Sequence, residues 1–237
     1  MNDHQSFQRF AALAAIISFP LALGGIVLSG MAIDFKFMEA STNVPFWLSS
    51  LSIGADGARL LRWGLILDML SYYLPLLPVA LFLWRWIGPR NPDWALFYTS
   101  CGLGYILVGA IGAAILAAVH PPLISAYAQA SVEQRPVLET VFSAIWNMVY
   151  RGMWGILDTL LVGIWFLGIG LLLRGERRLF SIFSIILGIL ALLGWLGVIL
   201  SIEAIALLGV IYGLFAPVWA LWLGIDLLRK PVQIEAA

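Results

Sequence analysis

Six long apolar segments, separated by short polar stretches, dominate the pattern of hydrophobic and polar positions along this chain of 237 residues. The first of them, Phe10–Ile33, runs 24 residues without a charged side chain. A helix rises ~1.5 Å per residue, so about 20 apolar residues cross a hydrocarbon core of about 30 Å. The pattern therefore predicts an all-α fold, a polytopic transmembrane helix bundle with six spans, forming a single integral membrane domain over residues 1–237. The predicted spans are 10–33, 63–84, 94–119, 152–173, 179–202 and 204–225.

The last two spans are separated by very little polar sequence. Between Leu179 and Leu228 the only charged residues are Glu203 and Asp226. A straight helix of that length would measure about 75 Å, more than twice the thickness of a bilayer core. The chain is therefore expected to reverse direction near Glu203.

Two of the connections between spans are long, and both fall on the side opposite the termini. The connection 34–62 is one, and the connection 120–139, which opens with Pro121–Pro122, is the other. Residues 132–150 are expected to form a partly amphipathic helix that runs into the fourth span.

Composition and charge agree with a membrane protein. Hydrophobic residues make up 62% of the chain and charged residues only 11%, against roughly 25% in a typical soluble domain. The net charge is zero and neither end is strongly basic or acidic, so membrane lipid is the expected partner and nucleic acid is not. Cys101 is the only cysteine, which excludes a disulfide within the chain and a cluster of thiolate metal ligands.

The distribution of lysine and arginine predicts the orientation of the bundle. Six spans put both termini on one side, and that side carries eight of the thirteen basic residues. Cytoplasmic connections are enriched in Lys and Arg, so both termini are expected in the cytoplasm. The eight are Arg9, Arg85, Arg90, Arg174, Arg177, Arg178, Arg229 and Lys230, and the other five are Lys36, Arg59, Arg62, Arg135 and Arg151.

Charged side chains inside the apolar segments are the strongest candidates for a functional site, because an ionisable group at membrane depth is costly. Asp68 and Asp158 each lie six residues inside a span, or ~9 Å below its outer end. With α-helical spacing, Asn147, Arg151 and Asp158 fall on one face of the fourth helix, as Asp68 and Tyr72 do on the second. The candidate polar cluster comprises Asp68, Asp158, Arg151, Asn147, Arg62 and Tyr72.

Two interpretations of this cluster remain open. In the first, Asp68 and Asp158 pair with Arg62, Arg151 or a tyrosine and only hold two helices together. In the second, the carboxylates form an outward-facing site that binds a substrate or a proton. Arg151 is a poor partner for Asp158 within their own helix, so Asp158 is expected to find its partner on another helix, the second being favoured. Placement of the two carboxylates on opposite sides of the bundle would exclude the second interpretation and leave the first.

The sequence offers few residues that could bind a cofactor. A bis-histidine haem needs two histidines within the membrane, and only His120 lies near a span. Retinal needs a lysine within a span, but the only lysines are Lys36 and Lys230. The chain has no Walker sequence, no HExxH, no GxSxG and no Cys/His cluster, so neither a metal site nor catalysis is expected. The cofactor, if any, stays open, with His120 as a candidate single ligand for a pigment or metal.

Three stretches carry a resemblance to a known group of proteins. They are Arg59–Leu60–Leu61–Arg62–Trp63–Gly64–Leu65–Ile66–Leu67–Asp68, Gly88–Pro89–Arg90–Asn91–Pro92 and Gly168–Ile169–Gly170–Leu171–Leu172–Leu173–Arg174. In these, and over most of its length, the chain resembles bacterial inner-membrane proteins of an uncharacterised six-helix family, a domain of unknown function. The resemblance implies a six-span bundle with Asp68 early in the second span, and it implies no activity.

Two functions are compatible with these observations. The first is a non-enzymatic accessory or binding subunit of a membrane assembly, which would contact other membrane subunits. The second is a small proton-coupled transporter or permease with its site at Asp68 and Asp158. The two halves of the chain, 1–119 and 120–237, show no convincing similarity, and the absence of an inverted repeat favours the first.

Overall fold

The computed structural model describes residues 3–33, 46–230 and 232, and these are helical apart from short turns. Six helical stretches in the described part are long and apolar enough to cross a membrane. The predicted all-α membrane protein with six spans is therefore confirmed. The elements are α1 (Asp3–Ala32), α2 (Phe46–Ser49), the 3-10 turn η2 (Ser50–Ser52), α3 (Gly54–Asp68), the π-helical η3 (Met69–Tyr73), α4 (Leu76–Ile87), α5 (Pro92–Gln129), α6 (Arg135–Trp146), the π-helical η4 (Asn147–Asp158), α7 (Thr159–Leu172), α8 (Arg178–Leu200) and α9 (Glu203–Arg229).

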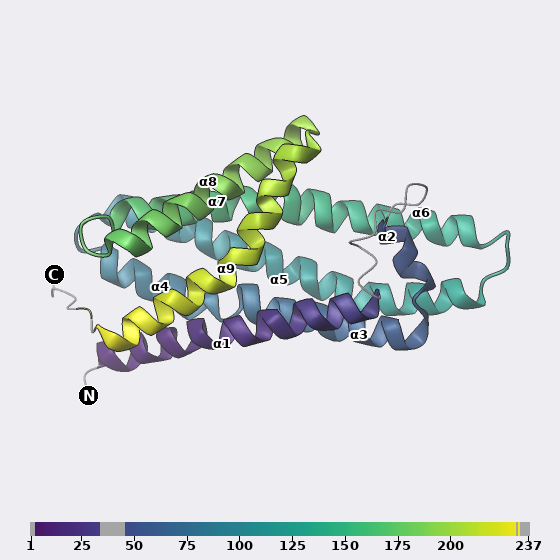
Figure 1. The fold of residues 1–237 in the computed structure, drawn as a ribbon, viewed down its shortest axis with the longest axis horizontal. Helices are drawn as coiled ribbons and strands as arrows, with labels where there is room; N and C mark the ends of the chain where they lie inside the picture. The colour runs from purple at the N-terminus through teal and green to yellow at the C-terminus, as the bar shows by residue number, and fades with distance from the viewer. Residues whose placement is uncertain (1–2, 34–45, 231, 233–237) are drawn as a thin grey trace.

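The six spans form a closed ring in which neighbours in sequence are neighbours in space. The second span is α3–η3–α4, the third is α5 and the fourth is α6–η4–α7. Each packs against the spans before and after it, and α9 returns to pack against α1. The start of α1 and the end of α9 lie at the same end of the bundle, and the α8–α9 hairpin leans across the others (Figure 1).

The third and fourth spans continue well beyond the predicted membrane segments. α5 has 38 residues, or about 57 Å, while α8 has 23 residues, or about 34 Å. α5 and α6 therefore extend past the α8–α9 hairpin at the end opposite the termini, where α2 and the start of α3 cover them (Figure 1).

The connection expected to open at Pro121–Pro122 is helical instead, because α5 continues through both prolines to Gln129. A proline removes only its own backbone donor and crowds the carbonyl four residues earlier. Tertiary packing outweighs that cost here, since Ile124 is fully buried in a small core with Leu51 and Phe142. By contrast, the predicted helix before the fourth span is present as α6, and residues 34–45 of the other long connection lie outside the described residues.

The reversal predicted near Glu203 is confirmed. α8 ends at Leu200, and α9 begins at Glu203. Ser201 has φ 56° and ψ 37°, a left-handed conformation that usually belongs to glycine at the end of a helix. Close helix packing supports the hairpin, because a Cβ on Gly194 would lie 2.4 Å from the backbone nitrogen of Gly209.

Large aromatic side chains fill the half of the bundle nearer the termini. Trp219 of α9 is fully buried, with its ring centroid 5.7 Å from Trp165 and 4.5 Å from Phe166. Its indole Nε1 donates to Ser184 Oγ at 2.7 Å, so its polar atom is satisfied. This core fixes α7, α8 and α9 together.

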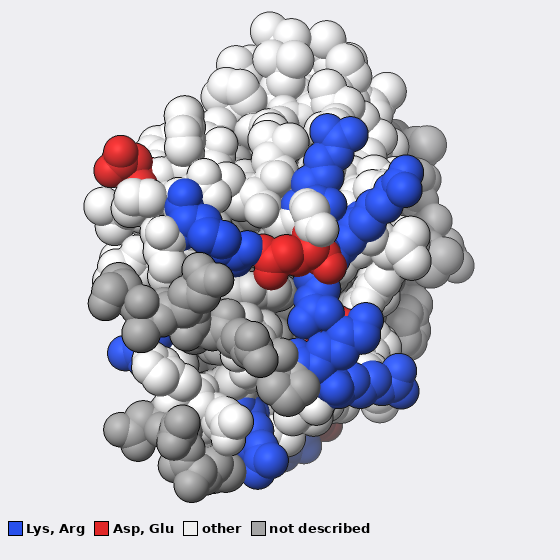
Figure 2. Space-filling view, turned by 90° about the vertical axis from the view of Figure 1, so that its left-hand side faces the viewer, with Lys and Arg blue, Asp and Glu red and all other residues white. Residues whose placement is uncertain are grey.

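Polar contacts tie the ends of the helices together where α1 begins and α9 ends. Gln8 Nε2 donates to the carbonyl of Leu227 at 2.7 Å, and Arg177 Nε lies 3.2 Å from Asp226 Oδ2. Arg90 forms an ion pair with Glu176. Figure 2 shows the Lys and Arg side chains of this end gathered around the acidic ones. Seven of the eight basic residues counted above lie at the ends of described helices here or in the turns beside them, and Arg9 lies in the first turns of α1.

Candidate functional site

Two π-helical segments lie beside the two intramembrane carboxylates. Asp68 is the last residue of α3, directly before η3, and Asp158 is the last residue of η4. In η3 the N–H of Leu74 bonds to the carbonyl of Met69, five residues earlier, at 3.1 Å. Pro75 follows and lacks a backbone donor, which favours a distorted turn before it. Such wide turns are frequent at functional sites, because they re-aim side chains that an α-helix would align differently.

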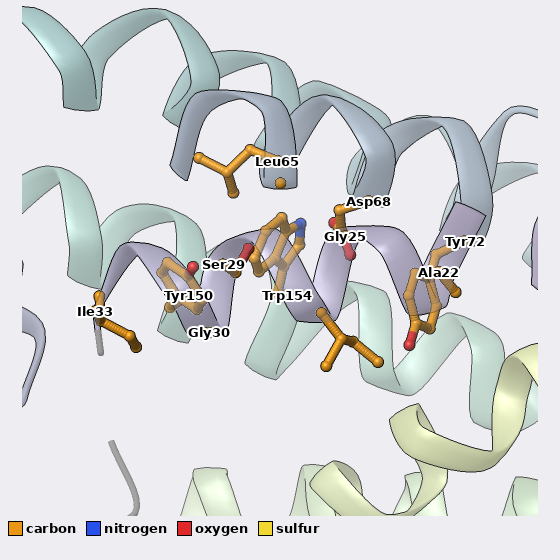
Figure 3. A pocket seen from close by; sticks show the side chains of 12 residues that line it. Ala22, Gly25, Ser29, Gly30, Ile33, Leu65, Asp68, Tyr72, Tyr150 and Trp154 are labelled. Atoms are coloured by element: carbon orange, nitrogen blue, oxygen red, sulfur yellow. The ribbon is translucent and has the colours of Figure 1, made fainter. Parts of the chain in front are cut away.

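Asp68 lines a pocket of about 320 Å³ between α1, α3 and η4. The α1 wall is made of small or aliphatic residues, among them Gly25 and Ser29. Close approach needs glycine here, since a Cβ on Gly64 would lie 2.3 Å from Ser29 Oγ. Figure 3 shows the Asp68 carboxylate beside the rings of Tyr72 and Trp154. The lining residues are Ala22, Gly25, Ile26, Ser29, Gly30, Ile33, Gly64, Leu65, Asp68, Tyr72, Tyr150 and Trp154.

Asp158 does not line this pocket and is 5% exposed. Its Oδ1 has no hydrogen-bond partner among the described residues. Asp68 and Asp158 are within range of an electrostatic interaction, so both carboxylates lie in the same region of the bundle. That Asp158 finds its partner on the second helix stays a prediction, since no hydrogen bond or ion pair joins it to that helix in the described residues.

Buried tyrosines surround the carboxylates. Tyr73, Tyr105 and Tyr212 are each near enough to Asp158 to interact with it electrostatically. Tyr105 Oη donates to the backbone carbonyl of Tyr72 at 3.0 Å. The sequence-based cluster did not include these three residues. A buried tyrosine hydroxyl needs a polar partner, and the sequence already places Tyr105 and Tyr212 inside apolar spans. Both residues could therefore have been added to the candidate cluster.

Compensating arginines are absent from the described surroundings of the carboxylates. Arg62 and Arg151 are both exposed, and neither forms an ion pair with Asp68 or Asp158 in the described part of the chain. The pairing with these arginines that the sequence suggested was therefore wrong. The carboxylates face tyrosines, a tryptophan and each other.

The predicted shared face of Asn147, Arg151 and Asp158 was also wrong, because residues 147–158 are π-helical. Seven residues advance an α-helix by almost two full turns, which would leave Arg151 and Asp158 about 20° apart. A π-helix, with i→i+5 bonds and about 4.4 residues per turn, puts them on nearly opposite faces. Asp158 accordingly points into the bundle, while Asn147 and Arg151 line a different pocket beside the α8–α9 hairpin.

His120 lies apart from this cluster, on α5. It is 1% exposed and stacks against Phe142, with ring centroids 4.8 Å apart. Neither ring nitrogen has a hydrogen-bond partner among the described residues. No group of three or more His, Cys, Asp or Glu side chains that could hold a metal ion is found in the described residues, and His120 remains a candidate single ligand.

Comparison with known proteins identifies a family for this chain. A family model whose description reads "Domain of unknown function (DUF4386)" matches residues 48–230. The match covers all spans except the first, and it includes Asp68, Asp158 and the residues around them. No curated protein matches, and no solved structure matches.

Proposed function

This chain belongs to the family described as a domain of unknown function (DUF4386), and we propose that it is a small proton-coupled permease for a cation, with its binding site at Asp68 and Asp158. The observation that carries the proposal is a pair of carboxylates at membrane depth, Asp68 on a pocket wall and Asp158 buried, without a basic ion-pair partner in the described residues. Ionisable groups inside a membrane protein are expensive, and they typically mark the path of an ion, a proton or a substrate.

The pocket chemistry favours an organic cation. Asp68 supplies a negative charge, and the rings of Tyr72, Tyr150 and Trp154 surround the same space. Aromatic faces attract an ammonium group within about 6 Å, and a nearby carboxylate adds to the attraction. A pocket of about 320 Å³ is at the small end of the range for ligand sites, which suits a compact amine.

The second carboxylate, Asp158, couples transport of the cation to transport of a proton. A proton held by the Asp68–Asp158 pair removes their repulsion, and so does a bound cation. The two occupants therefore compete, which is the requirement for exchanging a cation against a proton. Asp158 does not line the pocket, so its role is to hold the proton rather than to contact the cation.

Transport into proteoliposomes tests the proposal. With an outward proton gradient, vesicles containing the wild-type protein should accumulate radiolabelled tetraethylammonium, and Asp68→Asn or Asp158→Asn should abolish the accumulation. Asp56→Asn is the matched control, since Asp56 lies on the same helix as Asp68 but is exposed and pairs with Arg59 at 3.1 Å. Uptake that persists in Asp68→Asn would refute the site.

The accessory-subunit hypothesis predicts a different result. The wild-type protein would neither bind nor transport the cation, Asp68→Asn would lower only thermal stability, and a second membrane protein would co-purify. Mass analysis of the protein purified in mild detergent distinguishes the two.

Orientation is part of the proposal. The eight basic residues near the termini favour cytoplasmic termini, so the Asp68 pocket, which lies toward the opposite ends of its helices, would face the outer side. The permease would then take its cation from the outer leaflet side.

A further inference from the structure

A second pocket lies between η4 and the tip of the α8–α9 hairpin. Its volume is about 530 Å³. It shares only Tyr150 with the Asp68 pocket, and neither Asp68 nor Asp158 lines it. The residues that line it are Trp146, Asn147, Tyr150, Arg151, Gly197, Val198, Ser201, Glu203 and Ala206.

Two side chains of opposite charge line this pocket without forming an ion pair with each other. Arg151 and Glu203 are exposed, and neither forms an ion pair or a side-chain hydrogen bond within the described residues. A guanidinium and a carboxylate held in one concave space, but not paired, are arranged to bind a ligand that carries both charges. Asn147 and Ser201 add neutral polar atoms to the same wall.

The pocket lies where two apolar spans, α8 and α9, meet at a turn, which is the position expected for lipid headgroups. Its floor is the turn at which α8 leaves the apolar core and α9 re-enters it, since Ser201 and Ile202 separate the two helices. Trp146 and Tyr150 stack with ring centroids 3.6 Å apart on the opposite wall. Tryptophan and tyrosine are enriched where a membrane protein meets the headgroup region.

Apolar surface adjoins the charged one. Val198 lines the pocket, and the neighbouring Ile199, Leu200 and Ile202 are all at least 41% exposed. Exposed aliphatic side chains next to a headgroup-level pocket favour a ligand with acyl chains over a fully soluble one.

We propose that this pocket binds a zwitterionic phospholipid whose headgroup carries a phosphate and a primary ammonium, as in phosphatidylethanolamine. The Arg151 guanidinium binds the phosphate through paired N–H donors, as arginine does in phosphate sites. The Glu203 carboxylate accepts from the ammonium, and the acyl chains lie along Val198 and the exposed residues beside it. The proposal is independent of the proposed function, because it uses neither Asp68 nor Asp158.

Native mass spectrometry of the delipidated protein, titrated with lipids of identical acyl chains, tests this proposal. The wild-type protein should retain phosphatidylethanolamine about tenfold more strongly than phosphatidylglycerol, the ratio expected for one charge-assisted hydrogen bond. Glu203→Gln should remove that preference, and Arg151→Gln should weaken the binding of both lipids. Arg59→Gln, an exposed arginine outside the pocket, should change neither.

Two results would overturn the proposal. One is equal retention of the two lipids by the wild-type protein, or a preference that survives in Glu203→Gln. The other is equally tight binding of soluble phosphoethanolamine, which would assign the pocket to a free metabolite. Both substituted side chains are exposed, so loss of the fold does not complicate either variant.

Discussion

Replacing Gly109 with alanine tests how closely α5 packs against η3, the π-helical segment that follows Asp68. A Cβ at this position would lie 1.8 Å from Cε1 and 2.2 Å from Cζ of the Tyr73 ring. Tyr73 is only 6% exposed, so its ring has no free space into which to move. The carbonyl of Gly109 also accepts a hydrogen bond from Trp154 Nε1 at 3.3 Å, which links the same residue to the fourth span.

The expected loss of stability follows from two opposing terms. Forcing an extra methyl group into a packed core costs about 1–3 kcal/mol, while alanine in place of glycine favours a helix by at most about 1 kcal/mol. The net loss is then about 1–2 kcal/mol. For a chain of this size 1 kcal/mol corresponds to roughly 2–4 °C, so the midpoint of unfolding should fall by about 2–8 °C.

The assay is thermal unfolding in detergent, followed by size-exclusion chromatography of the heated samples. Gly213→Ala is the matched control, because a Cβ on Gly213 would meet nothing within 4 Å, and its midpoint should be unchanged or slightly higher. If Gly109→Ala and Gly213→Ala unfold at the same temperature, the argument from close packing is wrong.

A double variant gives an independent check. Tyr73→Ala removes the ring that the new methyl group would meet, so Gly109→Ala should cost much less in that background. Equal costs of Gly109→Ala in the two backgrounds would mean that the ring is not what opposes the methyl group.

Three further predictions concern the ends of the helices. A cytoplasm-active reporter fused after Lys230 should be active and one inserted between α5 and α6 inactive, and the reverse pattern would invert the proposed orientation. Arg177→Gln should lower stability by about 1–2 kcal/mol, because its ion pair with Asp226 is largely shielded from water, while Arg59→Gln should change stability by less than about 0.5 kcal/mol. Equal effects of these two substitutions on the unfolding midpoint would contradict the burial argument. Ser201→Gly should raise stability by about 0.5–1 kcal/mol, since it relieves a left-handed conformation, and a lower midpoint would show that the serine side chain contributes more than the strain.

The number and order of the spans could be predicted because each depends on a local property, a run of apolar residues long enough to cross a bilayer. The ends of the helices could not. Pro121 and Pro122 are local signals for the end of a helix, yet α5 passes through them because Ile124 is buried against residues far away in the sequence. Prediction failed there because a tertiary contact outweighed a local preference.

The candidate site likewise combines one feature that the sequence could predict with one that it could not. Depth along a helix needs only a residue count, so Asp68 and Asp158 could be placed at similar depth. The direction of a side chain needs the helical period, and the period of residues 147–158 is not α-helical. An error of less than one residue per turn, accumulated over seven residues, was enough to assign Arg151 to the wrong pocket.

Closure of the ring has a consequence for how the protein is made. α1 leaves the ribosome first, but one of its two neighbours, α9, is synthesised last. Until α9 is made, the face of α1 that later packs against Gly224 is covered only by lipid or by a chaperone. The two helices pack closely at that face, since a Cβ on Gly224 would lie 2.6 Å from the carbonyl oxygen of Ala12. Termination before α9 therefore leaves two seams open, one on α1 and one on α8. Membrane quality-control proteases are therefore expected to recognise such a chain as incompletely folded, even when its first five helices are correctly inserted.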